Sequence, residues 1–64
     1  MSPTPAVPIT CVVADDHPAV LEAVAEFLVQ GGIEVIARAH DGEEALERIE
    51  QRKPLVALVD VRMP

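Results

Sequence analysis

Two short, predominantly apolar runs place the strongest constraint on how this 64-residue chain can fold. Residues 9–14 read ITCVVA and residues 55–59 read LVALV. Runs of this length with no regular polar position are typical of strands buried on both faces, as in the centre of a parallel sheet. Because Phe27 is the single aromatic residue, the core around these strands must be aliphatic.

The segment 18–30 has the pattern of an amphipathic helix. Pro18 suits the first turn, where a missing N–H costs no hydrogen bond, and either Asp16 or His17 could cap it. Gly31 and Gly32 end the helix, because glycine tolerates the left-handed conformation that is common at the ends of helices. The apolar residues at helical spacing are Val20, Leu21, Val24 and Leu28, with Ala25 and Phe27 beside them.

A second strand and a second helix follow. Residues 33–39 place an apolar side chain at every second position, which predicts an outer strand with one buried face. Asp41 and Glu44 fit the N-cap and N3 positions of a capping box, and Pro54 ends the helix. Glu44 and Arg48 are spaced to pair across one turn. We expect the buried stripe of this helix to comprise Ala45, Leu46 and Ile49.

The order strand–helix–strand–helix–strand predicts an α/β fold with a parallel sheet and helices packed over it. We interpret residues 1–8, MSPTPAVP, as a flexible leader and residues 9–64 as one structural unit. A chain of this length buries only about 60% of the surface of its unfolded form, so its margin of stability is thin.

Composition excludes several classes of protein. No apolar run approaches the roughly 20 residues that span a bilayer, and the first residues lack the pattern of a signal peptide. The single cysteine, Cys11, cannot form an internal disulfide, and we expect it in the core. A reducing cytoplasm is the expected location. The net charge of −6 argues against nucleic-acid binding by the surface of this segment.

Three aspartates stand where the two apolar runs end. Asp15 and Asp16 follow the first run, and Asp60 follows the second. If those strands are neighbours, the three carboxylates converge at the carboxyl edge of the sheet, where ligands bind in open α/β folds. Charges about 4 Å apart repel by roughly 1 kcal/mol in water and about 4 kcal/mol at a surface-like dielectric. Either protons or a cation must offset this repulsion, and a small set of oxygen ligands suits Mg²⁺ better than Zn²⁺.

Two histidines could be taken for ligands. His17 stands beside the acidic pair at the start of the first helix, where we interpret it as a cap or surface residue rather than a metal ligand. His40 has no nearby ligand set and is interpreted as a solvated turn residue.

Three segments together resemble the first half of a response-regulator receiver domain of two-component signalling: DDHPAVLEAVAEFL, DGEEAL and LVDVRMP. They stand in the order and spacing of that family, and the resemblance covers residues 9–64. The chain resembles in particular the regulators that carry a helix-turn-helix DNA-binding domain after the receiver. The resemblance implies a truncated flavodoxin-like fold with parallel strands in the order 2-1-3.

The resemblance also implies roles for particular residues. Asp60 is similar to the phospho-acceptor, which takes a phosphoryl group from the phosphohistidine of a histidine kinase. Asp16 would bind Mg²⁺ directly, Asp15 chiefly through water, and Asp60 and the backbone carbonyl of Arg62 would complete the protein ligands. The segment would be no enzyme itself, and its parent would be a transcription regulator that contacts DNA through a separate C-terminal domain.

The family pattern includes two residues that this sequence does not reach. A receiver has a Ser or Thr at the end of its fourth strand and a Lys at the end of its fifth, and both help to hold the phosphoryl group. We therefore expect the 64-residue fragment to be poor in phosphotransfer and signalling. The alternative interpretation is a non-catalytic assembly module that forms a homodimer or larger assembly through the unpaired edge of its last strand.

Overall fold

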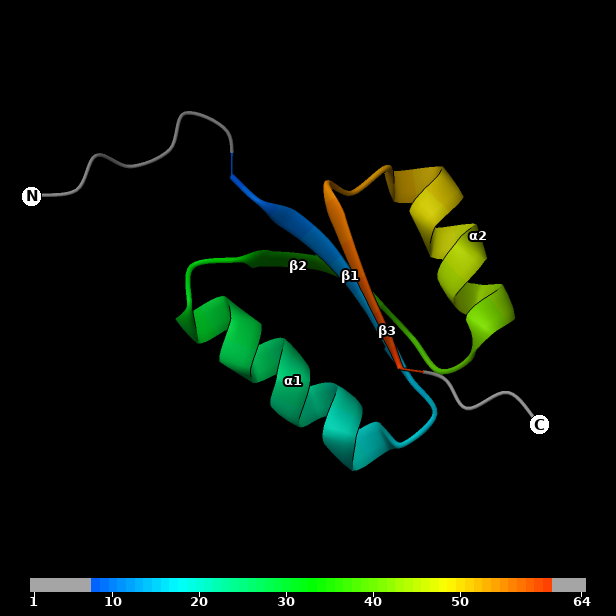
Figure 1. The fold of residues 1–64 in the computed structure, drawn as a ribbon, viewed down its shortest axis with the longest axis horizontal. Coiled ribbons are helices and arrows are strands. Elements are labelled where there is room, and N and C mark those ends of the chain that lie inside the picture. Colours follow the sequence, from blue (N-terminus) through cyan, green and yellow to red (C-terminus); the bar gives the residue numbers. More distant parts are fainter. Residues whose placement is uncertain (1–7, 61–64) are drawn as a thin grey trace, which may run out of the picture.

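The computed structural model describes residues 8–60 as a three-stranded parallel sheet with a helix on each face (Figure 1). The strands are β1 (Thr10–Asp15), β2 (Glu34–Ala39) and β3 (Val56–Asp60), and the helices are α1 (Pro18–Gln30) and α2 (Gly42–Arg52). Both outer strands pair in parallel with β1, which confirms the predicted order 2-1-3. Neither described helix is long and apolar enough to cross a membrane. Residues 1–7 of the predicted leader, and Arg62, lie outside the described residues.

The central strand β1 forms the core of both layers. Its residues from Cys11 to Ala14 are all buried, as the apolar run predicts. Cys11 and Val13 pack with Leu21 of α1 on one face of the sheet. On the other face Ala14 belongs to a cluster of small side chains that allows α2 to approach closely. Burial also raises the pKa of the Cys11 thiol, in keeping with its expected place in the core.

β2 is an outer strand as predicted, but its alternation of faces is broken by an irregularity in its pairing with β1. Val35 lies opposite Cys11, whereas Ala37, two residues later, lies opposite Val12, the very next residue of β1. An extra residue of this kind reverses the faces of all the residues that follow it. Val35 therefore packs in the cluster under α1, and Ala39 in the cluster under α2.

The ends of α1 follow the expectation except for the cap at its N-terminus. His17 occupies the N-cap position, but its side chain makes no capping hydrogen bond. Pro18 opens the first turn, as predicted. At the other end the predicted glycine pair follows the helix: Gly31 has a negative φ of −81°, and Gly32 takes the positive φ of 89° that glycine adopts without strain.

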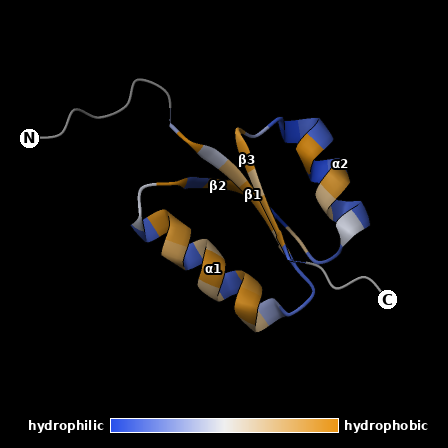
Figure 2. Cartoon of the chain, viewed as in Figure 1, coloured by the Kyte–Doolittle hydropathy of each residue, from blue (hydrophilic) through white to orange (hydrophobic). Residues whose placement is uncertain are grey.

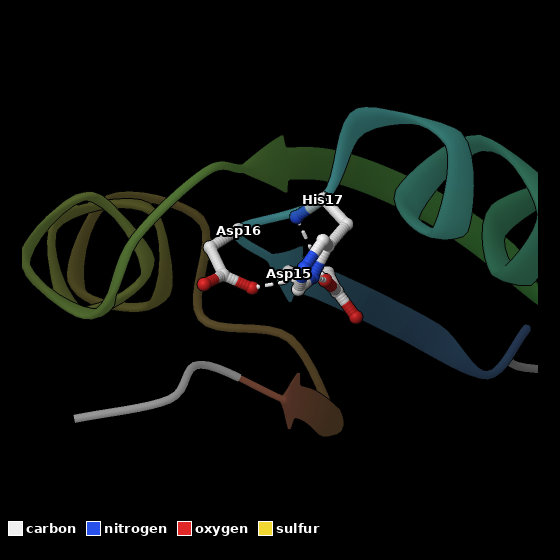
Figure 3. Close-up of side chains that lie close together, drawn as sticks. All are labelled: Asp15, Asp16 and His17. Carbon is white, nitrogen blue, oxygen red and sulfur yellow. Dashed lines mark hydrogen bonds and ion pairs between the residues drawn. The ribbon is translucent and has the colours of Figure 1, made fainter. Parts of the chain in front are cut away.

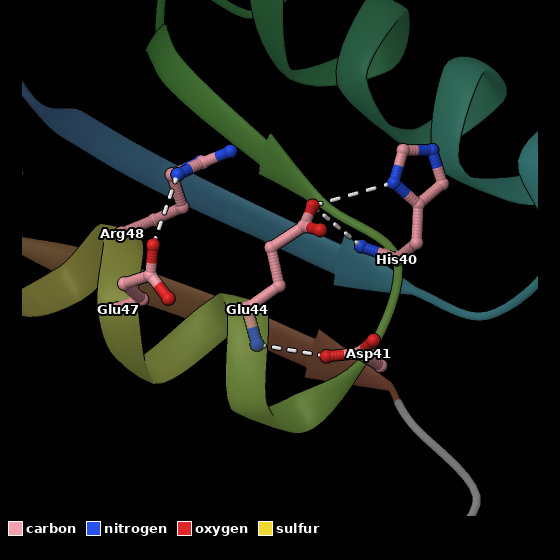
Figure 4. A network of polar contacts seen from close by, with 5 residues as sticks. All are labelled: His40, Asp41, Glu44, Glu47 and Arg48. Atoms are coloured by element: carbon pink, nitrogen blue, oxygen red, sulfur yellow. Dashed lines mark hydrogen bonds and ion pairs between the residues drawn. The ribbon is translucent and has the colours of Figure 1, made fainter.

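The start of α2 is held by a polar network (Figure 4). Asp41 is the predicted N-cap, and its Oδ1 accepts a 2.7 Å hydrogen bond from the backbone N–H of Glu44. The Glu44 carboxylate accepts from the backbone N–H of His40, at 3.2 Å, rather than from that of Asp41. The expected Glu44–Arg48 pair is absent among the described residues, because Glu44 turns back to His40 and Arg48 lies 3.8 Å from Glu47.

Two apolar surfaces expected to be buried are exposed. Leu46, predicted within the buried stripe of α2, is 63% exposed, while Ala45 is buried. In β3, Val56, Leu58 and Val59 each remain about half exposed, although the strand is almost wholly apolar (Figure 2). The reason is its position: β3 lies at an edge of the sheet, and α1 packs on β1 and β2 but not on β3 within residues 8–60.

Leucines 21 and 46 offer a matched test of this core. Leu21→Ala should lower the free energy of unfolding by about 2–5 kcal/mol, because it leaves a cavity against Cys11 and Val13. Leu46→Ala should change the free energy of unfolding by less than about 0.5 kcal/mol, since the Leu46 side chain is exposed on α2. Urea denaturation followed by circular dichroism measures both, and equal losses would contradict the described packing.

Candidate functional site

The three predicted carboxylates meet at one edge of the sheet. Asp15 and Asp60 are direct partners in the pairing of β1 with β3, so both lie at the carboxyl ends of neighbouring parallel strands. β1 ends one position later than predicted, so Asp15 is the last residue of the strand rather than the first residue after it. A pocket of about 290 Å³ opens there, and it is lined by Asp15, Asp16, His17, Val20 and Asp60.

Asp15 is a buried carboxylate with its hydrogen bonds satisfied locally. Its side chain is 5% exposed, and its Oδ1 accepts a 2.9 Å hydrogen bond from the backbone N–H of His17. This bond is the main reason why the pKa of Asp15 lies below its usual value of 3.8. Burial opposes the shift without reversing it, and the His17 ring adds to it. Asp15 therefore carries its negative charge at neutral pH.

His17 connects the two members of the acidic pair. Its Nδ1 lies 2.8 Å from Asp16 Oδ1 and 3.2 Å from Asp15 Oδ1, so the imidazole stands between the two carboxylates (Figure 3). The ring is 60% exposed, as expected for a surface residue, and it occupies the N-cap position. Sequence reasoning missed its contact with both aspartates, although adjacency to an acidic pair was the available signal.

The donor set fits a divalent cation. Among the described residues, ligand atoms of Asp15, Asp16 and His17 lie within 4.8 Å of one another. Asp60 lines the same pocket but does not belong to that closer group, and the proposed fourth ligand, Arg62, lies outside the described residues. Carboxylate oxygens at this separation are the hard ligands that Mg²⁺ accepts, and the pocket is large enough to retain water as well.

Asp60 differs from the acidic pair in its surroundings. It ends the edge strand β3 and is exposed, and its side chain makes no hydrogen bond or ion pair to another residue in the stretch 8–60. Asp15 is buried, and Oδ1 of Asp16 is already in contact with His17. Of the three carboxylates, Asp60 is therefore the one most open to a reactant that enters the pocket.

Comparison with known proteins gives a consistent result. A family model described as the response regulator receiver domain matches residues 11–64. The chain is 48% identical over 54 residues to the probable transcriptional regulatory protein NarL of Mycobacterium tuberculosis. It is 34% identical over 53 residues to the DNA-binding transcriptional activator EvgA of Escherichia coli. It is also 41% identical over 56 residues to a protein-glutamate methylesterase/protein-glutamine glutaminase of Haloarcula marismortui.

These alignments cover most of this chain and a small part of each relative. They include 83% of the chain for NarL and for EvgA, and 88% for the methylesterase. The chain spans only 25%, 26% and 15% of the lengths of NarL, EvgA and the methylesterase. Two of the three names describe transcriptional regulators and one describes an enzyme, so the matched segment occurs with different activities.

The lowered pKa of Asp15 has a consequence for stability in acid. The unfolded chain binds a proton at this carboxyl group more tightly than the folded chain does, so its contribution is complete above about pH 4 and is lost as the pH falls further. Asp15→Asn should flatten this part of the acid limb, whereas Glu43→Gln on the exposed surface of α2 should leave it unchanged. Urea unfolding between pH 2 and pH 6 measures the slopes, and an unaltered slope for Asp15→Asn would refute the assignment.

Proposed function

Because this chain belongs to the response regulator receiver family, we propose that Asp60 accepts a phosphoryl group from a histidine kinase while Asp15 and Asp16 hold Mg²⁺. The observation that carries the proposal is the direct pairing of Asp60 with Asp15 across β1 and β3, in a pocket that also contains Asp16. This arrangement brings an open carboxylate next to a buried, charged one.

The chemistry follows from the differences among the three carboxylates. An oxygen of Asp60 attacks the phosphorus of the kinase's phosphohistidine, a P–O bond forms, and the P–N bond breaks as the imidazole leaves and takes up a proton. Bound Mg²⁺ would offset the negative charge of the carboxylates and of the phosphoryl group. Asp15 is ionised although its side chain is buried, whereas the Asp16 side chain is partly exposed, and both line the pocket.

Arg62 is the remaining proposed ligand. Its backbone carbonyl would join Asp15, Asp16 and Asp60 around Mg²⁺, as the family resemblance implies. We further propose that the parent is a transcription regulator that contacts DNA through a domain outside these 64 residues, as the names EvgA and NarL suggest. In this role the segment is a phosphoryl acceptor and not an enzyme.

A small phosphodonor tests the acceptor directly. Incubation with acetyl phosphate and Mg²⁺ should add one phosphoryl group to a minor fraction of the chain, and tandem mass spectrometry should locate it on Asp60. The yield should be low, because the Ser or Thr and the Lys of the family pattern are not among these residues. Asp60→Asn should abolish labelling, while Asp41→Asn, a cap of α2 away from the pocket, should not.

Two outcomes would contradict this assignment. Labelling that persists in Asp60→Asn would show another acceptor, and labelling that survives removal of Mg²⁺ by a chelator would exclude the proposed role of the cation. Complete and rapid labelling of the wild-type chain would overturn the expectation of poor phosphotransfer.

A second candidate function, self-association of the 64-residue chain, is favoured by the exposure of β3. Val56, Leu58 and Val59 are each about half exposed, and a groove of about 170 Å³ between α1 and β3 is lined mainly by apolar side chains. One edge of β3 has no strand beside it in the described sheet. Apolar edge strands of this kind pair readily with a second chain, so the proposed occupant is another copy of this chain.

Sedimentation velocity tests this second candidate. The wild-type chain should sediment as a dimer or larger species, and Leu58→Lys should shift it toward monomer by placing a charge in the apolar groove. Leu46→Lys, an equally large change at an exposed leucine of α2, should have no such effect. A wild-type chain that is monomeric at the concentrations used for structural work would refute self-association.

A further inference from the structure

His17 contacts both members of the acidic pair, and the proposed function assigns this contact no role. His17 Nδ1 lies within hydrogen-bonding distance of one oxygen of Asp15 and one of Asp16, at 3.2 Å and 2.8 Å (Figure 3). Ionised carboxylate oxygens only accept hydrogen bonds, so Nδ1 carries the hydrogen in its bond to Asp15 Oδ1, and the same nitrogen lies at ion-pair distance from Asp16 Oδ1. The nitrogen's lone pair is then not available to a metal ion.

A ring N–H in this position occupies the place of a cation. Mg²⁺ bound directly to Asp16 Oδ1 would lie about 2.0–2.1 Å from that oxygen, and Asp15 would be reached chiefly through a water on the ion. Nδ1 of His17 lies within 3.2 Å of both of these carboxylate oxygens, and the partial positive charge of its N–H would repel such an ion. The two arrangements therefore exclude each other.

We propose that His17 is an internal stand-in for the cation, which bridges Asp15 and Asp16 in the ion-free protein and swings out when a divalent cation binds both. This inference rests on the cation site of the proposed function. The ring is 60% exposed, so rotation about its side-chain torsions carries it into solvent without a rearrangement of the core. The backbone N–H of His17 keeps its own bond to Asp15, at 2.9 Å, and so anchors the loop in either state.

The consequence is a trade between affinity and ion-free stability. With His17 in place, the acidic pair is partly neutralised before any ion arrives, so the two carboxylates repel each other less. A cation must break the two ring contacts, and its affinity is lowered accordingly. Hydrogen bonds of this kind are worth about 1 kcal/mol net, which corresponds to a factor of about five in affinity.

The test compares Mg²⁺ affinity in three chains by isothermal titration calorimetry. His17→Ser removes the imidazole and keeps a residue favoured at the N-cap position, so the fold should be retained. It should bind Mg²⁺ about two- to fivefold more tightly than the wild type. His40→Ala is the matched control, because His40 also contacts a carboxylate, that of Glu44 at 3.3 Å, but away from the pocket. Its affinity should equal that of the wild type.

A second measurement separates the stand-in from a purely structural role. In a chelator, His17→Ser should unfold at lower urea concentration than expected from its cap alone, because the two carboxylates lose their bridge. Saturating Mg²⁺ should remove that part of the difference. A difference that is the same with and without Mg²⁺ would overturn the proposal.

The remaining outcomes are also decisive. Weaker Mg²⁺ binding by His17→Ser would overturn the stand-in and make His17 a ligand, while leaving the cation site of the proposed function intact. Unchanged binding would overturn the stand-in alone. If neither the wild type nor His17→Ser binds Mg²⁺ in a folded sample, both the stand-in and the cation site are refuted.

Discussion

The burial of β1 is the constraint on which the rest of the structure depends. This strand is hydrogen-bonded on both edges, to β2 and to β3, and covered on both faces, by α1 and by α2. Each neighbouring element finds its position by packing or pairing with it. One strand thus supplies buried side chains to both layers of the described sheet. Its last residue is Asp15, so the strand that organises the core also fixes the candidate site.

The buried negative charge of Asp15 must be stabilised, and the residue two positions later in the chain provides the hydrogen bonds. A charged side chain that is 95% buried requires hydrogen bonds, and Asp15 receives them from the backbone and the ring of His17. The same residue holds the N-cap position of α1, with Pro18 next in the chain. The turn between β1 and α1 is therefore one unit, in which the start of a helix and the environment of a buried carboxylate are set together.

The edge strand β3 gives Asp60 its distinct character. Only one side of β3 pairs with the described sheet, and α1 does not cover it, so its side chains remain partly open to solvent. The exposure leaves apolar surface uncovered. It also leaves the Asp60 carboxylate accessible, in contrast to Asp15 directly across the ladder. Accessibility and incomplete burial at this strand thus have the same physical origin.

The sequence by itself determined the order of elements and the meeting of the aspartates. Predominantly apolar runs, helical spacing after Pro18 and the Asp41 cap are local signals, and parallel strands carry residues at their carboxyl ends to one edge. The family resemblance supplied the strand order. The sequence could not specify the faces of β2, because the extra residue between Val35 and Ala37 is defined only by pairing with β1.

The tertiary structure likewise decided the exposure of Leu46, the partner of Glu44 and the bridge from His17 to Asp15 and Asp16. These features depend on which neighbour lies within a few ångströms once the elements have packed. Periodicity reports which residues could face a core. Only the three-dimensional arrangement decides how far that core extends and which polar groups meet beside it.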